Sequence, residues 1–322
     1  MRRYLLRRLL GAIPTLLVIA TLAFAMLHAV PGGPFDAARP MEPEIRKAIL
    51  AKYHLDEPVW QQYLHYLGDL ARGNLGPSFQ YRGTSVNELI AQGLPVDLAV
   101  GGTALLLALL AGTSIGLYAA LHRNSRRDWL LMGLAVAGIS IPLFVIAPVL
   151  VLVFALKLHW LPPGDWVAGS LAHLVLPAVA LALPYTAYIA RLTRGSALEV
   201  LGSAYIRTAR AKGLPLRVIM LRHALRPTLL PVVSFLGPAI AGVITGSIVI
   251  ETVFALPGIG RYFTLGALNR DYTLVMGITI LYGALIIACN LLVDLAYALL
   301  DPRVRHAACA RGTDCGRMPG GA

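Results

Sequence analysis

The sequence contains six long apolar blocks separated by shorter polar segments. Each block is long enough for a helix that crosses a bilayer, which needs about 20 mostly apolar residues. The blocks cover residues 9–30, 98–121, 129–156, 171–189, 228–250 and 274–300. The fourth block contains Pro177 and Pro184, so we expect it to be kinked or partly unwound. The pattern predicts an all-α membrane protein with six transmembrane helices.

The composition agrees with this pattern and excludes several classes of protein. Of the 322 residues, 57% are hydrophobic and 14% are charged. Soluble domains carry roughly a quarter charged residues, so a disordered chain and most soluble enzymes are excluded. Four arginines precede the first block, as in a secretory signal peptide, but the block is longer than the apolar region of such a peptide. We therefore interpret it as a retained helix.

The basic residues are concentrated in alternate connecting segments. If the N-terminus is cytoplasmic, the cytoplasmic segments are 1–8, 122–128, 190–227 and 301–322. These segments hold 19 basic and 4 acidic residues, and the outer segments hold 9 basic and 11 acidic residues. The asymmetry follows the positive-inside rule and places both termini in the cytoplasm. It also accounts for the net charge of +12 without a nucleic-acid partner.

The blocks divide the chain into an N-terminal transmembrane helix (1–30), an outer segment (31–97), a five-helix core (98–300) and a tail (301–322). In the outer segment we expect one helix to open at Pro43. A second helix should follow Pro58, with Trp60, Leu64 and Leu67 on one face and Gly73 as its C-cap. The tail lacks hydrophobic periodicity, so we expect it to be disordered.

Motifs for catalysis and metal binding are absent from the sequence. There is no GxxxxGK[ST] phosphate loop and no HExxH, and the 8 histidines are scattered. Residues 112–116 match the GxSxG pattern of serine hydrolases, with Ser114 as the nucleophile. That motif needs a sharp turn between a strand and a helix, whereas these residues lie inside an apolar helical block. We expect no catalytic residue, no metal site and no cofactor bound by this chain.

Small residues and one acid inside the blocks are candidates for helix packing or for a transport pathway. Gly112 and Gly116 form a GxxxG pair, as do Gly242 and Gly246, and such pairs let membrane helices approach closely. Asp294 lies inside the sixth block, where an ionisable group is a functional candidate; pairing with an arginine near the cytoplasmic interface is the favoured structural alternative. Glu251, at the end of the fifth block, is expected at the outer interface.

The cytoplasmic segment between the fourth and fifth blocks predicts an ordered pair of helices. The first would have Glu199 near its start and basic residues in its last turns, as the helix macrodipole favours. Gly213 can adopt the left-handed cap, and Pro215 prevents the helix from continuing. A second short helix would end before Pro227. This arrangement favours docking to a partner protein, and the alternative is a charged linker on anionic lipid headgroups.

The same segment resembles the cytoplasmic coupling loop of importer-type ATP-binding-cassette permeases. It departs from the general Glu-Ala-Ala pattern of that loop, with Arg207, Thr208 and Ala209 at those positions, and its closing Pro227 comes one residue late. From Tyr205 to Gly213 it reads Tyr-Ile-Arg-Thr-Ala-Arg-Ala-Lys-Gly, the form found in the peptide and nickel permease branch.

Further runs extend the resemblance over about residues 1–305. They include Gly76-Pro77-Ser78-Phe79 in the outer segment, Leu256-Pro257-Gly258-Ile259-Gly260, and residues 266–272. The runs in the outer segment resemble oligopeptide permease subunits more closely than dipeptide or nickel permease subunits. A dipeptide or nickel permease remains the alternative.

The resemblance implies a type I importer permease in the bacterial inner membrane. Its partners would be a second, similar permease chain, two ATPase chains that bind ATP and Mg, and a periplasmic or lipid-anchored peptide-binding protein. The coupling loop would span residues 193–226. Its contact residues would be Glu199, Tyr205, Arg207, Thr208, Ala209, Arg210, Ala211, Lys212 and Gly213. An intramembrane hydrolase would rest on Ser114 alone, and a passive channel would need no docking loop.

Overall fold

The protein is represented by a computed structural model that describes residues 2–29, 44, 47, 51, 56–81 and 83–300. Within these residues the chain is helical, apart from connecting turns and one isolated bridge between Pro77 and Ser85. The chain forms two compact units. Unit 1 contains Met1–Thr103, Leu143–Leu181 and Val243–Ile287, and unit 2 contains Ala104–Pro142, Ala182–Gly242 and Ala288–Ala322.

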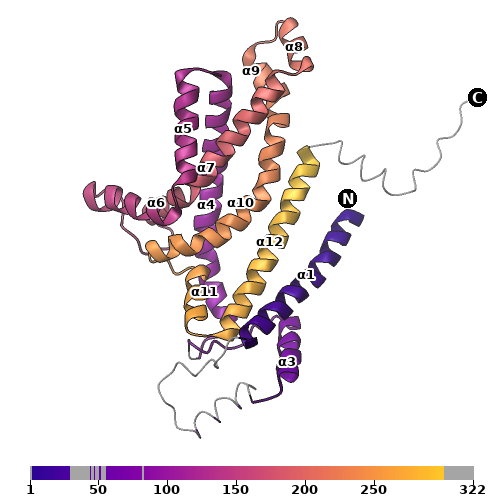
Figure 1. The fold of residues 1–322 in the computed structure, drawn as a ribbon, viewed down its shortest axis with the longest axis vertical. Coiled ribbons are helices and arrows are strands. Elements are labelled where there is room, and N and C mark those ends of the chain that lie inside the picture. Colours follow the sequence, from indigo (N-terminus) through magenta and orange to yellow (C-terminus); the bar gives the residue numbers. More distant parts are fainter. Residues whose placement is uncertain are drawn as a thin grey trace, which may run out of the picture. The chain divides into compact units, whose positions relative to one another are not determined.

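Five long helices account for five of the six predicted blocks (Figure 1). They are α1 (Arg2–Ala29), α4 (Val86–Leu121), α7 (Leu171–Leu201), α10 (Leu225–Val253) and α12 (Tyr272–Leu300). The shorter elements are α3 (Val59–Ala71), α5 (Arg126–Ser140), α6 (Leu143–Leu150), η1 (Val151–Lys157), α8 (Ala204–Ala211), α9 (Leu216–Val218), η2 (Ile219–Ala224) and α11 (Ile259–Leu268). The elements η1 and η2 have π-helical hydrogen bonding.

The third predicted block, 129–156, is not one straight helix. It forms α5 and then α6 with η1, and this bent pair gives a sixth span only if it is counted as one. The break follows from Pro142, because the residue before a proline is disfavoured in the helical region. Ile141 has ψ 122°, an extended conformation, and α6 begins after the proline.

The fourth block forms a longer and more regular helix than the sequence predicts. Helix α7 begins at Leu171 and continues without a break to Leu201, although it contains Pro177 and Pro184. Of the two expected outcomes, a kink or partial unwinding, the continuous helix excludes the unwinding. Each proline removes one backbone hydrogen bond, and helices within a membrane bundle tolerate that loss.

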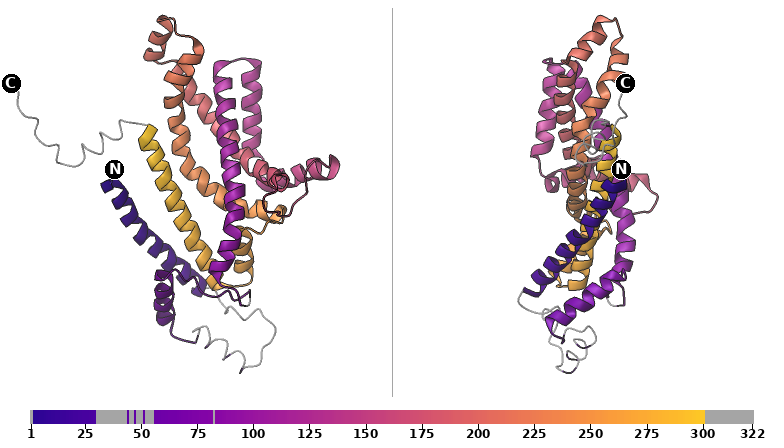
Figure 2. Two further views of the ribbon diagram at one scale, coloured as in Figure 1. Left: turned by 180° about the vertical axis from the view of Figure 1, so that it is seen from behind. Right: turned by 90° about the vertical axis from the view of Figure 1, so that its right-hand side faces the viewer.

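In the outer segment, the helix predicted after Pro58 is present as α3, and Gly73 follows it with φ +75°. The aromatic and polar side of α3 contacts the C-terminal end of α1. Figure 2 shows the two helices next to each other at that end. The hydroxyl groups of Thr21 and Tyr63 are 2.6 Å apart, and His28 lies 3.2 Å from the Gln62 side chain. Trp60, on the apolar face predicted from the sequence, does not share in this contact and is exposed. Of the helix predicted from Pro43, the structure describes only Glu44, Lys47 and Ala51, which are helical. The tail lies outside the described residues.

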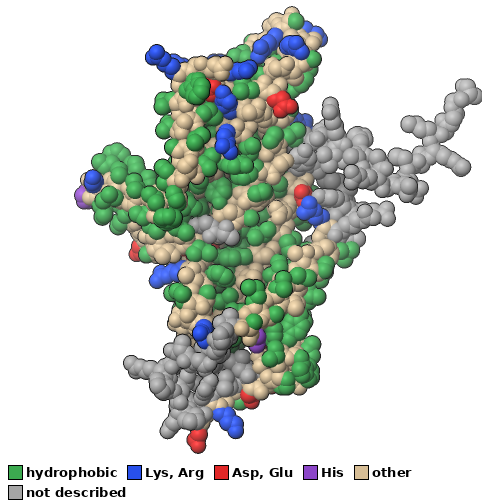
Figure 3. All heavy atoms as spheres, viewed as in Figure 1, with side chains coloured by type: hydrophobic (Ala, Val, Ile, Leu, Met, Phe, Trp, Pro, Cys, Tyr) green, Lys and Arg blue, Asp and Glu red, His purple; other side chains and the backbone are tan. Residues whose placement is uncertain are grey.

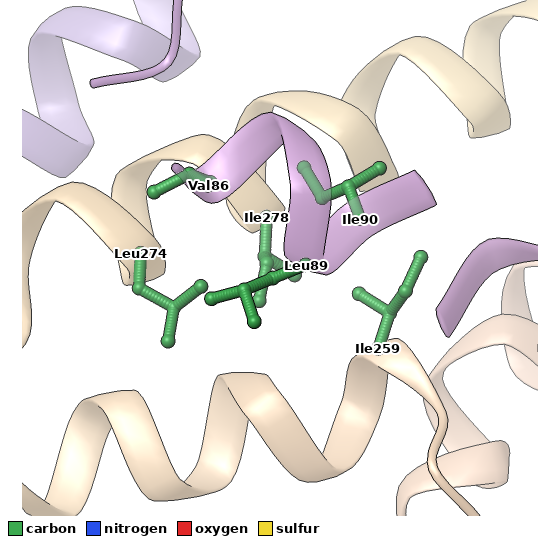
Figure 4. Packing of buried hydrophobic residues seen from close by; sticks show 6 residues of the cluster. All are labelled: Val86, Leu89, Ile90, Ile259, Leu274 and Ile278. Atoms are coloured by element: carbon green, nitrogen blue, oxygen red, sulfur yellow. The ribbon is translucent and has the colours of Figure 1, made fainter. Parts of the chain in front are cut away.

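Unit 1 contains a hydrophobic core built from the N-terminal end of α4, the start of α11 and the start of α12 (Figure 4). Its buried members are Val86, Leu89, Ile90, Ile259, Leu274 and Ile278. The α4 members follow the i, i+3, i+4 spacing of one helix face. This core fixes the short helix α11 against two long helices of the same unit.

Two acids hold the N-terminus of α11 in unit 1. The backbone N–H of Ile259 donates to Asp97 of α4 over 3.1 Å, and that of Arg261 donates to Glu251 of α10 over 2.8 Å. Both carboxyl groups closely approach Gly258, where a side chain would clash with them. Glu251 is only 2% exposed within the unit, and its position relative to the outer interface stays a prediction. Its carboxyl group caps free N–H groups at a helix start, which accounts for its burial.

A third buried acid, Asp271, joins the outer loop to the start of α12. Its carboxyl group accepts the hydroxyl of Ser78 over 2.5 Å and the backbone N–H of Gln80 over 3.0 Å. It also accepts the N–H of Leu274 over 3.1 Å, as an N-cap residue does. The outer loop is thereby fixed to a residue that lies far from it in the sequence.

In unit 2, α4 packs against α7 through glycine; the two run side by side in Figures 1 and 2. A Cβ atom at Gly116 would lie 2.5 Å from the carbonyl oxygen of Ala190 and 2.6 Å from the Cβ of Thr193. One at Gly112 would lie 2.9 Å from the Cβ of Ile189. These separations leave no room for a methyl group, which is the role of small residues in membrane helix pairs.

We predict that Gly116→Ala destabilises the subunit, because the new methyl group must push α7 away from α4. The unfolding temperature of the purified subunit in detergent should fall by several degrees. Gly195→Ala in α7 is the matched control, since a Cβ there meets no atom within 4 Å. Equal stability of the two variants would contradict the close packing at Gly116.

Candidate functional site

The loop that the charge distribution predicts to be cytoplasmic begins where α7 ends, at Leu201. The predicted single helix from Glu199 is interrupted, because Gly202 and Ser203 separate α7 from α8. Glu199 therefore belongs to the last turn of α7 and not to the start of the loop helix. Ser203 has an extended backbone with ψ 156°, and its hydroxyl donates to the carbonyl of Val200 over 2.6 Å. This local bond competes with helix continuation, as serine side chains commonly do.

Helix α8 ends at Ala211, and Gly213 adopts the predicted left-handed conformation with φ +76°. The N–H of Gly213 donates to the carbonyl of Arg210 over 2.9 Å, and the N–H of Leu214 donates to that of Ala209 over 3.3 Å. This pair of bonds is a Schellman motif, which favours glycine at the left-handed position. Pro215 follows in an extended conformation and prevents continuation.

The return from the loop runs directly into the next long helix. Helix α9 is followed by η2 and then by α10 without a break. Pro227 therefore does not end a short second helix, as the sequence predicted, because it lies in the first turn of α10. Because η2 runs into α10, Pro227 lies inside a continuous helix and removes one backbone hydrogen bond from it.

The loop has its own small core, made of Ile206 and Ala209 from α8 and Ile219 and Ala224 from η2. Ala209 is 8% exposed and belongs to this core. The expectation that Ala209 contacts a partner protein directly is therefore wrong, because its methyl group faces the interior of the loop. A glutamate there would disrupt the loop itself before it could report on docking.

The outer surface of the loop combines exposed apolar and basic side chains. Its apolar members are Tyr205, Leu214, Leu216, Val218 and Leu221, of which Leu221 is 73% exposed. Its basic members are Arg207, Arg210, Lys212, Arg217 and Arg222, all exposed. We call this set the loop surface. Figure 3 shows basic side chains gathered at the end of the molecule that carries α8 and α9. Apolar patches with a charged rim are typical of protein interfaces.

The predicted loop contacts thus fall into two groups. Tyr205, Arg207, Thr208, Arg210, Ala211, Lys212 and Gly213 are exposed, whereas Ala209 is internal. Ile206, which the sequence analysis did not select, is fully buried and holds α8 to η2. The helical spacing of Ile206 and Ala209, three residues apart, was the signal for this buried face.

Among the described residues, no group of three or more His, Cys, Asp or Glu side chains could hold a metal ion. Ser114 lies within α4, and its hydroxyl donates to the carbonyl of Leu110 over 2.7 Å. The GxSxG residues are therefore part of a regular helix and not of the sharp turn that a hydrolase needs. This geometry disfavours the hydrolase alternative.

The remaining candidates for helix packing or a transport pathway lie in both units. Gly242 lies in α10 beside Tyr185 of α7, whose hydroxyl would be 2.5 Å from a Cβ atom at that position. Gly246 lies further along α10, in unit 1. Asp294 is partly buried in α12. Packing and a pathway role both stay predictions for these three residues.

A buried ion pair next to the loop was missed from the sequence. Asp128 at the start of α5 is 2% exposed, and its two carboxylate oxygens each accept a 2.6 Å bond from the Arg194 guanidinium of α7. Asp128 also accepts the N–H of Asn124, and Ser125 caps α5. The sequence signal for this ion pair was Asp128, a single acid within the basic connecting segment 122–128. This pair ties the α4–α5 turn to the last turns of α7.

Comparison with known proteins identifies the class. A family model described as "Binding-protein-dependent transport system inner membrane component" matches residues 112–306. The N-terminal model of the same transport systems matches residues 1–100. The chain belongs to this family of membrane components.

Several relatives match the chain over almost its full length. The oligopeptide transport system permease protein OppB of Escherichia coli (strain K12) is 54% identical over 306 residues, which are 95% of this chain and 100% of that protein. OppB of Haemophilus influenzae is 50% identical with the same coverage. The dipeptide transport system permease protein DppB of Bacillus subtilis is 45% identical over 95% of this chain and 98% of its own length.

Solved structures support the fold. The MetNI methionine ABC transporter in an inward-facing conformation matches with a TM-score of 0.54 and 17% identity, covering 66% of this chain and 96% of that chain. A second crystal form matches with a TM-score of 0.56 and 16% identity. The predicted architecture of a type I ABC importer permease is confirmed at the level of fold.

We predict that Asp128→Asn and Arg194→Gln each destabilise the subunit by about 3 kcal/mol, because each leaves the other member of the pair without its partner. The double variant should lose clearly less stability than the two single variants' losses added together, since both changes remove the same interaction. The free energy of unfolding in mixed detergent measures the cycle. Arg126→Gln, an exposed neighbour at the start of α5, is the control. Strictly additive losses would contradict the pairing.

Proposed function

We propose that this chain is a membrane-spanning permease subunit of an ATP-driven ABC importer that moves oligopeptides across the bacterial inner membrane. The observation that carries the proposal is the 54% identity to OppB over the whole of that protein. Identity to the dipeptide permease DppB is lower, at 45%. The absence of a phosphate-binding loop from the sequence assigns ATP hydrolysis to separate subunits.

The proposed assembly contains a second, similar permease chain, two ATPase subunits and a peptide-binding delivery protein. The loop surface is where we place the ATPase contact. It is exposed, it carries apolar and basic side chains on a folded support, and it offers no catalytic group. The helices α7 and α10 enter and leave the loop, so a movement of the loop reaches both of them.

The test of the substrate class is uptake by a strain that lacks its own peptide importers. The chain should be produced together with the transport proteins encoded beside its gene. We expect ATP-dependent uptake of peptides of three or more residues, and no uptake when the ATPase subunits are inactivated. Uptake of dipeptides alone, or of nickel alone, would contradict the oligopeptide assignment. Uptake that continues without ATP would indicate a channel.

The docking surface is tested by Leu216→Glu, which places a charge on a side chain that is 51% exposed. The loop core is untouched, so the subunit should insert normally while co-purification of the ATPases falls at least about tenfold. Leu121→Glu, at the exposed end of α4, is the matched control. Full co-purification with Leu216→Glu at equal membrane levels would disprove the contact.

The orientation rests on the 19 basic residues of the segments placed in the cytoplasm. Single cysteines at Gln80 and Ser203, in a background without the native cysteines, can be labelled with an impermeant thiol reagent in intact spheroplasts. We expect labelling at position 80 and none at position 203. The opposite result would reverse the topology.

A further inference from the structure

Two carboxyl groups meet at the N-terminus of α11, inside unit 1. Asp97 of α4 accepts the N–H of Ile259 over 3.1 Å, and Glu251 of α10 accepts the N–H of Arg261 over 2.8 Å. The two carboxyl groups are also within hydrogen-bonding contact of each other. Both approach the same side of Gly258, where a Cβ atom would clash with either one. We call Asp97 and Glu251 the acid pair.

The acid pair is shielded from solvent and has no compensating cation. Glu251 is 2% exposed, and one oxygen of each group, Oδ1 of Asp97 and Oε1 of Glu251, is buried without a hydrogen-bond donor. Neither acid forms an ion pair with a lysine or arginine in the described part of the chain. The N-terminus of α11 contributes only about half an elementary positive charge. Two full negative charges would therefore stay largely uncompensated.

Within the described residues, side chains of the neighbouring helices supply neither a positive charge nor a proton to the acid pair. Tyr282 of α12 lies close enough to feel the charge of both acids, but its hydroxyl is buried and donates to neither of them. Arg261 of α11 contacts Glu251 through its backbone N–H, and its side chain is exposed. The Ser247 hydroxyl also lies near Glu251, but its hydrogen is used in a 2.7 Å bond to the carbonyl of Ile244.

A single proton resolves the conflict between the two acids. Two ionised carboxylates are acceptors only and repel each other, whereas a carboxyl group that keeps its proton can donate it to its neighbour. The pair then carries one negative charge, which the N-terminus of α11 stabilises. A metal ion is less well served, because no third His, Cys, Asp or Glu among the described residues completes a set of ligands.

We propose that the acid pair shares one proton at neutral pH and that this proton is a pH-sensitive lock on α11. With the proton in place, the pair holds the start of α11 to both α4 and α10. When the proton is lost, two negative charges repel each other beside Gly258 and loosen this attachment. In the orientation that the charge distribution predicts, α11 lies on the outer side, so the external pH sets the state of the lock.

The direction of the pH effect follows from the number of bound protons. Above about pH 5 the unfolded chain holds no proton on either acid, because free Asp and Glu side chains titrate near pH 4. The native subunit holds one proton, so its stability falls as the pH rises, until the native pair has lost that proton as well. A difference of one proton changes the unfolding equilibrium constant about tenfold per pH unit.

The experiment compares the full-length wild-type subunit with Asp97→Asn. Asparagine mimics the protonated acid, since its amide can donate to Glu251 while its oxygen still accepts the N–H of Ile259. Unfolding in mixed detergent is measured from about pH 6 to about pH 9. Relative to the variant, the wild-type subunit should be destabilised about tenfold per pH unit while its native pair keeps the proton. Asp56→Asn, at an exposed acid of the outer segment, is the control and should follow the wild type.

Infrared spectroscopy detects the proton itself. At neutral pH the wild-type subunit should show the carbonyl band of a protonated carboxyl group, and this band should disappear as the pH rises. Asp97→Asn and Glu251→Gln should each lack the band, because the remaining acid is then ionised. Asp56→Asn should keep it. The wild-type measurement alone tests the shared proton, even if a variant fails to fold.

Three results would overturn the shared proton. The first is a pair of parallel pH curves for the wild type and Asp97→Asn, or a loss of stability in that variant at every pH, as expected for two ionised helix caps. The second is a wild-type spectrum without the protonated band at neutral pH. The third is stabilisation at high pH by sodium but not by choline at equal ionic strength, which would assign the pair to a metal ion. None of these measurements depends on peptide uptake, so each of these results would leave the proposed function intact.

Discussion

The approach of α4 to α7 is the constraint on which unit 2 of this protein depends. At Gly116 no side-chain carbon fits between the helices, so their separation is set by backbone contact and not by adjustable side chains. The Asp128–Arg194 pair lies next to this contact, between the start of α5 and α7, and fixes the turn between α4 and α5 to α7. Because α7 leads directly into the loop, these contacts determine where the loop surface is presented.

The loop is held to the helices that flank it by its own core and by chain continuity. Its core joins α8 to η2, and its two ends continue into α7 and α10. Within unit 2, Tyr188 of α7 stacks on Phe235 of α10 with ring centroids 4.2 Å apart. With the ATPase docked at the loop surface as proposed, a force on the loop would therefore act on both helices.

The sequence predicted the features that depend on local chemistry or on hydrophobic length. Five of the long helices and the helix after Pro58 follow from apolar runs, and the left-handed Gly213 follows from the pairing of glycine with Pro215. The break at Ile141 was also locally encoded, by Pro142, but an average of hydrophobicity over the block conceals it. Ala209 was misassigned because a small residue suits an interior and an interface equally well.

What the sequence could not predict are contacts between residues that lie far apart in it. Asp97 and Glu251 meet at the start of α11, and Asp271 meets Ser78 of the outer loop. Nothing near Asp97 or Ser78 in the sequence indicates these partners, since the pairing depends on how helices pack.

The outer acids differ in what they bind, and the difference is physical. Asp97, Glu251 and Asp271 all accept backbone N–H groups at the starts of helices, where the free donors and the helix dipole stabilise a buried carboxyl group. These three acids hold the frame of unit 1. Asp69 lies instead near the C-terminal end of α3, where the helix dipole opposes a negative charge.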